Sequence, residues 1–274
     1  MSLTRRRTAA ALVALPLALA ATPAVAHGPG GRPRPRTVHI AGDSTAAQKY
    51  ADAAPETGWG MALPCYLGRP LAVANHAMNG RSSKSFIDEG LLAALLEEVR
   101  AGDLLLIQFG HNDEKTEDPA RGTDPWTTYQ EHLRSYVRGA RDRRAQPVLL
   151  TPVERRRFAA DGTATPSHGE YPAAMRALAA EERVPLLDLQ ALTLARWQEL
   201  GPDGTRDYFN WLEPGESPNY PDGQQDNTHF QPRGAIEAAR LVAGALRDAR
   251  VLAPRDVRRT GSPVPPEWIT WPQA

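Results

Sequence analysis

Three short segments of the chain together carry the groups that acyl transfer requires. Residues 42–45 read GDST, residues 110–113 read GHND and residues 226–229 read DNTH. They supply a hydroxyl nucleophile, a histidine base, a carboxylate that can orient the base, and a neutral amide that can stabilise an oxyanion. Each segment is a weak signal by itself, because short polar motifs are common. Their combination predicts hydrolysis that depends on a serine.

Ser44, Asp226 and His229 are the candidate catalytic residues. Asp226 and His229 lie three residues apart in a polar segment, which we expect to be a loop before Pro232 opens the last helix. This spacing lets the carboxylate turn back to the imidazole Nδ1–H, so that Nε2 faces the serine. We expect Ser44 at a strand-to-helix turn, where a serine could also be a simple N-cap.

The backbone N–H of Ser44 is one candidate oxyanion donor, and two further residues are candidates as well. Gly80 offers a backbone N–H with no side chain to block close approach, and Asn112 offers a side-chain amide. The alternative interpretation is a plain turn at residues 79–80 and an ordinary loop residue at position 112.

Three further residues, Arg81, Lys84 and His111, are either neighbours of the site or solvated charges. His111 is less favoured than His229 as the base, because no carboxylate occupies a comparable orienting position in the sequence.

A zinc site is the alternative use of these side chains. Its ligands would be His111, Asp113, Asp226 and His229. Their spacings match no zinc motif such as H-E-x-x-H, and the serine would have no role in such a site. We therefore expect no metal and no cofactor.

Alternating strands and helices must position these residues. Apolar β-type runs and helical patterns alternate along the chain, and the run at residues 104–107 (LLLI) is continuous, as in a strand buried on both faces. This predicts a parallel sheet covered by helices on both faces, with function at the carboxyl ends of its strands. The expected strands are residues 37–41, 71–75, 103–109, 147–152 and 184–189, and the expected helices are residues 91–100, 127–144, 171–183, 192–200 and 233–249.

The ends of the chain differ from this core. Residues 1–26 have an arginine-rich start, an apolar run too short to span a bilayer and a final AVA, which predict a signal peptide and a secreted protein without membrane attachment after cleavage. Residues 27–36 are expected to be a disordered leader, and residues 37–252 the folded domain. Residues 253–274 form a proline-rich tail that we expect to wrap the surface.

Composition excludes several classes of protein. Lys and Arg (32) balance Asp and Glu (32), so nucleic acid is not an expected partner. Cys65 is the single cysteine, which excludes an intrachain disulfide, and its apolar context predicts a buried, inert thiol. About 250 residues can form one domain, which we expect to be monomeric.

The aromatic residues divide into two groups. Trp59 and Trp197 are expected in the core. The others fall in long connections rich in glycine and proline, where they could either stack on sugar rings or cover the core. They are Trp126, Tyr208, Phe209, Trp211 and Tyr220.

With these residues in view, the chain resembles the SGNH (GDSL-type) hydrolases, and within them the rhamnogalacturonan acetylesterase-like group. The match consists of residues 42–45, 79–86 (NGRSSKSF), 110–113 and 226–230 (DNTHF). Thr45, the RSSKSF run and His111 are typical of the acetylesterase-like group. The chain has no G-x-S-x-G elbow, so it does not resemble an α/β-hydrolase.

The resemblance implies a flavodoxin-like three-layer α/β/α sandwich. It implies Ser44 as nucleophile, His229 as base and Asp226 as its partner, with Ser44 N–H, Gly80 N–H and the Asn112 side chain as the oxyanion hole. It also implies removal of O-acetyl groups from an acetylated polysaccharide or oligosaccharide, pectic rhamnogalacturonan in particular. The alternatives are a lipase or thioesterase of the same fold, and a non-catalytic carbohydrate-binding protein.

Overall fold

Five parallel strands form the centre of the structure, a computed structural model that describes residues 35–274. Their order is β2-β1-β3-β4-β5, and every neighbouring pair is parallel. The proposed signal peptide and most of the proposed leader lie outside the described residues. The strands are β1 (Arg36–Gly42), β2 (Leu71–Asn75), β3 (Leu104–Gln108), β4 (Gln146–Leu150) and β5 (Leu186–Leu187).

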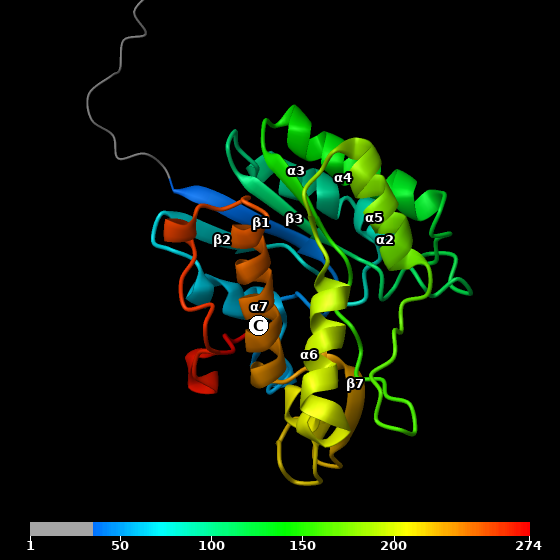
Figure 1. Ribbon diagram of the computed structural model, residues 1–274, viewed down its shortest axis with the longest axis vertical. Helices are drawn as coiled ribbons and strands as arrows, with labels where there is room; N and C mark the ends of the chain where they lie inside the picture. The colour runs from blue at the N-terminus through cyan, green and yellow to red at the C-terminus, as the bar shows by residue number, and fades with distance from the viewer. Residues whose placement is uncertain (1–34) are drawn as a thin grey trace, which may run out of the picture. The chain divides into compact units, whose positions relative to one another are not determined.

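Helices cover both faces of this sheet, which makes three layers (Figure 1). One face packs against α1 (Trp59–Ala62), α6 (Leu189–Gly204) and α7 (Pro232–Asp248). The other packs against α3 (Leu91–Glu98), α4 (Thr128–Asp142) and α5 (Tyr171–Glu182), with Phe86 of α2 (Ser83–Asp88) in the same cluster. The predicted α/β/α architecture is confirmed. Short 3₁₀ turns lie at Ala51–Ala53, Leu63–Tyr66, Arg206–Tyr208, Pro254–Asp256 and Pro266–Trp268.

The continuous apolar run in β3 serves both layers. Leu104 and Leu106 belong to the apolar cluster under α7, whereas Leu105 and Ile107 belong to the cluster under α4. Successive side chains of a strand point to opposite faces, so a strand between two helical layers must be apolar at every position. This alternation is why the run LLLI predicts a central strand.

The structure corrects two local expectations. Ser44 does not begin a helix: a single turn, in which Ala46 and Ala47 donate to the Asp43 carbonyl, is followed by chain without regular secondary structure. Asp226 and His229 do not lie in a loop, because they are part of β7 (Gln224–Phe230).

β7 pairs with β6 (Phe209–Leu212) in a separate antiparallel sheet. The paired residues Phe209 and Phe230 are fully buried in the core under α7 and hold one end of this sheet in place. The remainder of β7 is polar. Without an alternating apolar pattern, its sequence is typical of a loop, which explains why the strand was not expected.

The proline-rich tail is tied to the folded body. Val257, Val264 and Ile269 are buried, and the Val264 N–H donates to the Tyr66 hydroxyl over 3.0 Å. The Trp271 indole N–H donates to the Glu56 carbonyl over 2.8 Å. The tail therefore contributes to the core and also reaches the chain that follows β1.

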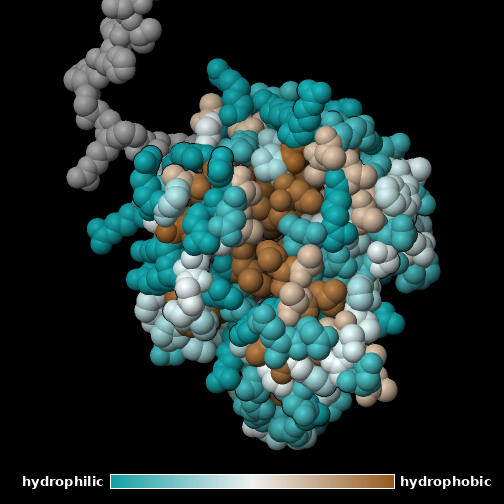
Figure 2. Space-filling view, in the orientation of Figure 1, coloured by the Kyte–Doolittle hydropathy of each residue, from teal (hydrophilic) through white to brown (hydrophobic). Residues whose placement is uncertain are grey.

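The face formed by α6 and α7 has apolar side chains gathered at its centre (Figure 2). They line a groove of about 520 Å³ whose apolar members include Leu187, Leu192 and Leu241. None of the helices within residues 35–274 combines the length and apolar character needed to cross a bilayer.

Candidate active site

Ser44, His229 and Asp226 form a continuous hydrogen-bonded relay. The Ser44 hydroxyl lies 2.8 Å from Nε2 of His229, and Nδ1 of the same ring lies 2.6 Å from Oδ2 of Asp226. A carboxylate can only accept, so Nδ1 carries the proton and Nε2 is left to accept the proton of the serine. The structure thus brings together the three side chains that the sequence predicts, from segments 185 residues apart.

Local backbone contacts fix the orientation of Asp226. Its Oδ1 accepts hydrogen bonds from the N–H groups of Thr228 and His229, over 2.6 and 3.0 Å, while Oδ2 faces the imidazole. Burial raises the pKa of Asp226, but the hydrogen bonds and the positive charge of His229 outweigh it, so the net pKa lies below 3.8. The carboxylate is therefore ionised at neutral pH.

His229 experiences opposing effects. Burial lowers its pKa, whereas the hydrogen bond to Asp226 and the charges of Glu56 and Asp226 raise it, and the charge of Lys49 lowers it again. The net pKa of His229 lies above 6.5. These contacts therefore make the His229 ring a stronger proton acceptor than an ordinary histidine.

Ser44 lies on the single turn that follows β1. The side chain of Asp43 accepts from the Thr45 N–H over 2.9 Å and from the Thr45 hydroxyl over 2.7 Å, which fixes this turn from below. Ser44 itself is 8 % exposed. Within residues 35–274 its backbone N–H has no hydrogen-bond acceptor, so it is available to a ligand.

The predicted oxyanion donors come from the ends of neighbouring strands. The turn that carries Gly80 follows β2 and is tied to β1 by a 3.0 Å hydrogen bond from the Met78 N–H to the Gly42 carbonyl. Asn112 follows β3, and its amide donates to the Arg81 carbonyl over 3.0 Å, which leaves a second amide hydrogen. Like that of Ser44, the Gly80 N–H has no acceptor among the described residues.

Gly80 has a φ of +76°, and a Cβ atom added there would meet nothing within 4 Å. The backbone conformation, and not a steric contact, is therefore what favours glycine at this position.

His111 differs from the expectation in one respect, because it does have a carboxylate beside it. Its Nδ1 lies 3.2 Å from Oδ2 of Asp43, and both side chains are buried. Burial lowers the pKa of His111 to about 4, so the ring is neutral at pH 7. The edge of the ring packs against His168, which in turn bonds to Glu114. His111 thus contacts Asp43, which directly precedes Ser44, and the His111 side chain is only 4 % exposed.

Asp113 also lies away from the relay. Both of its oxygens accept from the Ser83 N–H at 3.1 Å, and Oδ1 accepts from the Ser83 hydroxyl. This contact ties the start of α2 to the end of β3. Of the four side chains of the alternative zinc site, Asp226 and His229 bond to each other, whereas His111 lies against Asp43 and Asp113 bonds to Ser83. Residues 35–274 contain no cluster of three or more potential metal ligands.

The neighbouring cations are engaged by the protein itself. Arg81 forms an ion pair with Glu89 at 2.7 Å, and Lys84 donates to the Pro119 carbonyl. Cys65 is half-buried instead of fully buried; burial raises the pKa of its thiol, in keeping with an unreactive side chain.

The loop aromatics differ in burial and in their contacts. Phe209 is core, and Trp126, two residues before α4, is 47 % exposed. Trp211 stacks against two guanidinium groups. The Cζ atoms of Arg156 and Arg206 lie 4.5 Å and 5.2 Å from its ring centre. Tyr208 and Tyr220 are partly buried, and the expected core residues Trp59 and Trp197 are almost fully buried.

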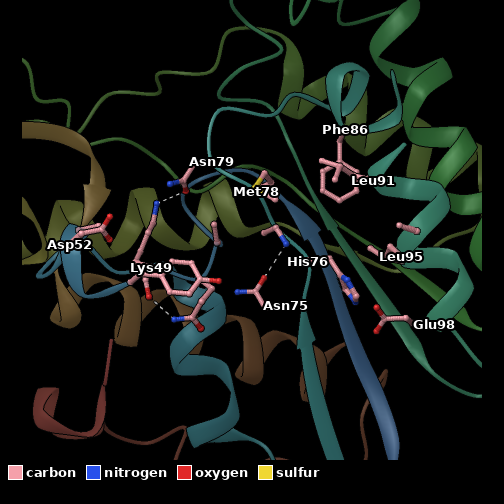
Figure 3. A pocket seen from close by; sticks show the side chains of 16 residues that line it. Lys49, Asp52, Asn75, His76, Met78, Asn79, Phe86, Leu91, Leu95 and Glu98 are labelled. Atoms are coloured by element: carbon pink, nitrogen blue, oxygen red, sulfur yellow. Dashed lines mark hydrogen bonds between the residues drawn. The ribbon is translucent and has the colours of Figure 1, made fainter. Parts of the chain in front are cut away.

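A cavity of about 450 Å³ opens beside the Gly80 turn (Figure 3). Its lining includes Asn79, directly before Gly80, but neither Ser44 nor His229. Tyr50 and Met78 also line it and are 41 % and 40 % exposed. Polar and apolar side chains thus meet in one hollow beside the proposed oxyanion hole.

Lys49 and Glu56 lie near the site but are not predicted from the sequence. Their charges act on His229, yet neither belongs to any of the three segments. The chain contains only three lysines, but rarity alone would not have marked this one.

A model of the GDSL-like lipase/acylhydrolase family matches residues 40–235. The rhamnogalacturonan acetylesterase RhgT of Bacillus subtilis is 45 % identical over 78 % of this chain and 91 % of its own length. The probable rhamnogalacturonan acetylesterase YesY of the same organism is 40 % identical over 77 % of this chain and 92 % of its own length.

Solved structures are similar in fold. Protein YxiM of Bacillus subtilis superposes with a TM-score of 0.68 at 28 % identity, covering 80 % of this chain, which spans 57 % of that protein. An acetylxylan esterase of Geobacillus stearothermophilus superposes with a TM-score of 0.52 at 16 % identity, over 78 % of this chain and 93 % of its own.

Proposed function

The chain belongs to the GDSL-like lipase/acylhydrolase family, and from this premise we propose that it is a secreted enzyme that removes acetyl groups from pectic rhamnogalacturonan. That it is a serine esterase acting on acetylated carbohydrate follows from its relatives. The observation that carries the proposal is the relay of Ser44, His229 and Asp226 beside two unpaired backbone N–H groups.

The geometry supports a two-step acyl transfer. His229 takes the Ser44 proton at Nε2 as Oγ attacks the acetyl carbonyl, and Asp226 balances the positive charge that forms on the ring. The ring then gives this proton to the departing sugar oxygen, leaving an acetylated serine. In the second step, His229 takes a proton from a water molecule as the water oxygen attacks the acetyl carbonyl. The bond between the carbonyl carbon and the serine oxygen then breaks, the serine oxygen receives the proton from His229, and acetate is released.

The oxyanion forms twice in this sequence, and three donors would receive it. They are the N–H groups of Ser44 and Gly80 and the free amide hydrogen of Asn112. Because these groups are fixed by the backbone of three neighbouring strand ends, little reorganisation is needed as the negative charge develops.

Two surface features favour a sugar over a lipid substrate. The hollow beside the Gly80 turn offers exposed Tyr50 and Met78 for the apolar face of a sugar, and Asp52 and Asn79 for its hydroxyls. The apolar groove between α6 and α7 is lined by no residue of the three catalytic segments.

Release of acetate from defined polymers tests the substrate. We expect release from acetylated rhamnogalacturonan to exceed release from acetylated homogalacturonan and acetylated xylan, with deacetylated polymers as the blank. A preference for xylan would contradict the pectic substrate. A preference for long-chain acyl esters would favour the lipase or thioesterase alternative, and binding of the polymer without acetate release would favour a carbohydrate-binding protein.

Secretion is supported by the pattern of residues 1–26 alone. We expect the protein exported by its native host to begin at His27, which N-terminal sequencing can measure. A start at Met1 in protein recovered from inside the cells, with none outside them, would contradict secretion.

A further inference from the structure

Lys49 is a buried lysine with two fixed partners. Its side chain is 1 % exposed, and Nζ lies 2.5 Å from Oε1 of Glu56 and 2.6 Å from Oδ1 of Asn79. Figure 3 shows the Lys49 ammonium reaching Asn79 across the edge of the hollow. Burying an ammonium is costly unless it is paired and hydrogen-bonded, so these two contacts fix where the group can lie.

One partner of Lys49 belongs to the oxyanion turn. Asn79 directly precedes Gly80, and the turn is closed by a hydrogen bond from the Arg81 N–H to the Met78 carbonyl. Lys49, on the chain after β1, donates to the side-chain oxygen of Asn79 and so restrains its amide. A shift of Asn79 would rotate the Gly80 N–H, because the two residues share a peptide unit.

The other partner is tied to the strand that carries the base. Glu56 is followed by Thr57, whose N–H donates to the Phe230 carbonyl over 2.8 Å, and Phe230 directly follows His229. The carbonyl of Glu56 accepts from the Trp271 indole, so this stretch is also held from the tail. The pair therefore spans from the oxyanion turn to the base.

We propose that Lys49 and Glu56 are positioning residues that hold the Gly80 turn and the His229 strand at the mutual distance that acyl transfer requires. The inference rests on the roles of Gly80 and His229 in the proposed function. It adds a connection between them that belongs to none of the three catalytic segments.

The charges of the pair give this proposal a distinctive signature. The charged groups acting on His229 are Asp226 on its own strand, and Glu56 and Lys49 from the chain after β1. Glu56 raises the pKa of His229 and Lys49 lowers it. Removing one member of the pair should therefore move the pKa in one direction, and removing the other should move it in the opposite direction.

The test measures kcat and KM for a small aryl acetate against pH in Lys49→Met, Glu56→Gln and the double variant. We expect kcat to fall roughly 10- to 100-fold with little change in KM, because small misplacements of reacting groups are costly. The acid limb, the part of the plot in which kcat/KM rises with pH, should move to higher pH in Lys49→Met and to lower pH in Glu56→Gln. In the double variant it should return towards the wild-type position while kcat stays low.

A matched control is the exposed ion pair between Arg134 on α4 and Glu181 on α5. Arg134→Met and Glu181→Gln change the same charges and should leave both the rate and the pH limb unchanged. Glu56→Gln keeps the shape of the side chain and carries the test if Lys49→Met fails to fold.

The inference would be overturned if the acid limb of the pH profile stayed in place in both variants, or moved in the same direction in both. Wild-type kcat in folded Glu56→Gln would overturn it as well. Either result leaves the serine mechanism intact, whereas full activity in Ser44→Ala would overturn the mechanism itself.

Discussion

At the scale of single residues, the proposed mechanism depends on the different partners of the two ring nitrogens of His229. Asp226 fixes the proton on one nitrogen, and Ser44 occupies the other. In the proposed mechanism the carboxylate has two effects: it orients the ring, and its charge stabilises the imidazolium that would form during the reaction. An amide in its place could still orient the ring, but it could not balance the charge.

Replacement of Asp226 by asparagine should therefore lower both the rate and the pKa of the base. The wild-type kcat/KM should rise with pH through the pKa of His229, which lies above 6.5, because only the neutral ring accepts a proton. In Asp226→Asn we expect a loss of roughly 10⁴-fold in kcat and an acid limb at lower pH. A pH–rate profile of both proteins measures this, and a limb at unchanged or higher pH would place the orienting carboxylate elsewhere.

Replacement of Asn112 by alanine should lower kcat by roughly 10² to 10³, about 3–4 kcal/mol, with little change in KM. The reason is that its amide is used mainly as negative charge develops on the carbonyl oxygen. Steady-state kinetics with an aryl acetate separate the two parameters. A change confined to KM would mean that Asn112 binds the substrate and does not stabilise the oxyanion.

These residues could be predicted from the sequence because their roles depend on residue type within short motifs. Ser44 and Asp226 each lie within hydrogen-bonding distance of His229, as predicted. Lys49 and Glu56 could not be found in this way. Their contact depends on how the chain after β1 folds back over the site, and neither residue lies in a motif.

At the scale of secondary structure elements, the site depends on three adjacent strands ending at the same edge. β2, β1 and β3 are neighbours in the sheet, and the segments carrying Gly80, Ser44 and Asn112 follow them. The expected strands at residues 37–41 and 71–75 are confirmed. They could be predicted because each is an apolar run. α1 and β6 were not expected, because they are short and lack a clear apolar period.

The turn after β2 is the most sensitive of these connections. Gly80→Ala has room for its Cβ, but the φ of +76° costs an alanine roughly 1–2 kcal/mol. Relief of this strain would turn the N–H away from the oxyanion. We expect a loss of about 10² to 10³ in kcat at nearly unchanged KM. Kinetics and thermal unfolding measure both effects, and wild-type kcat in the alanine variant would exclude this N–H as a donor.

At the scale of the whole molecule, the C-terminal tail contributes to the core and also contacts a residue near the candidate active site. Val264 and Ile269 fill part of the core under α7, while Trp271 bonds to the carbonyl of Glu56. The proline-rich sequence predicts a surface path for this segment but not its buried contacts. Those contacts depend on isolated apolar residues that have no period.

A chain that ends at residue 262 should be less stable by roughly 3–6 kcal/mol, from the burial of two aliphatic side chains at about 1.5–3 kcal/mol each. Urea unfolding measures the loss. Trp268→Ala is the control, because this tryptophan is 48 % exposed and its removal should change stability far less. Equal stability of the shortened and full chains would show that the tail does not contribute to the core.

The central claim, that a serine hydroxyl activated by His229 performs the hydrolysis, is tested most directly by Ser44→Ala. The measurement is kcat for a small aryl acetate, in protein whose circular dichroism and thermal unfolding match the wild type. We predict a loss on the order of 10⁴ to 10⁶, because the nucleophile is gone and no neighbouring group replaces it. Activity within tenfold of the wild type would contradict the serine mechanism.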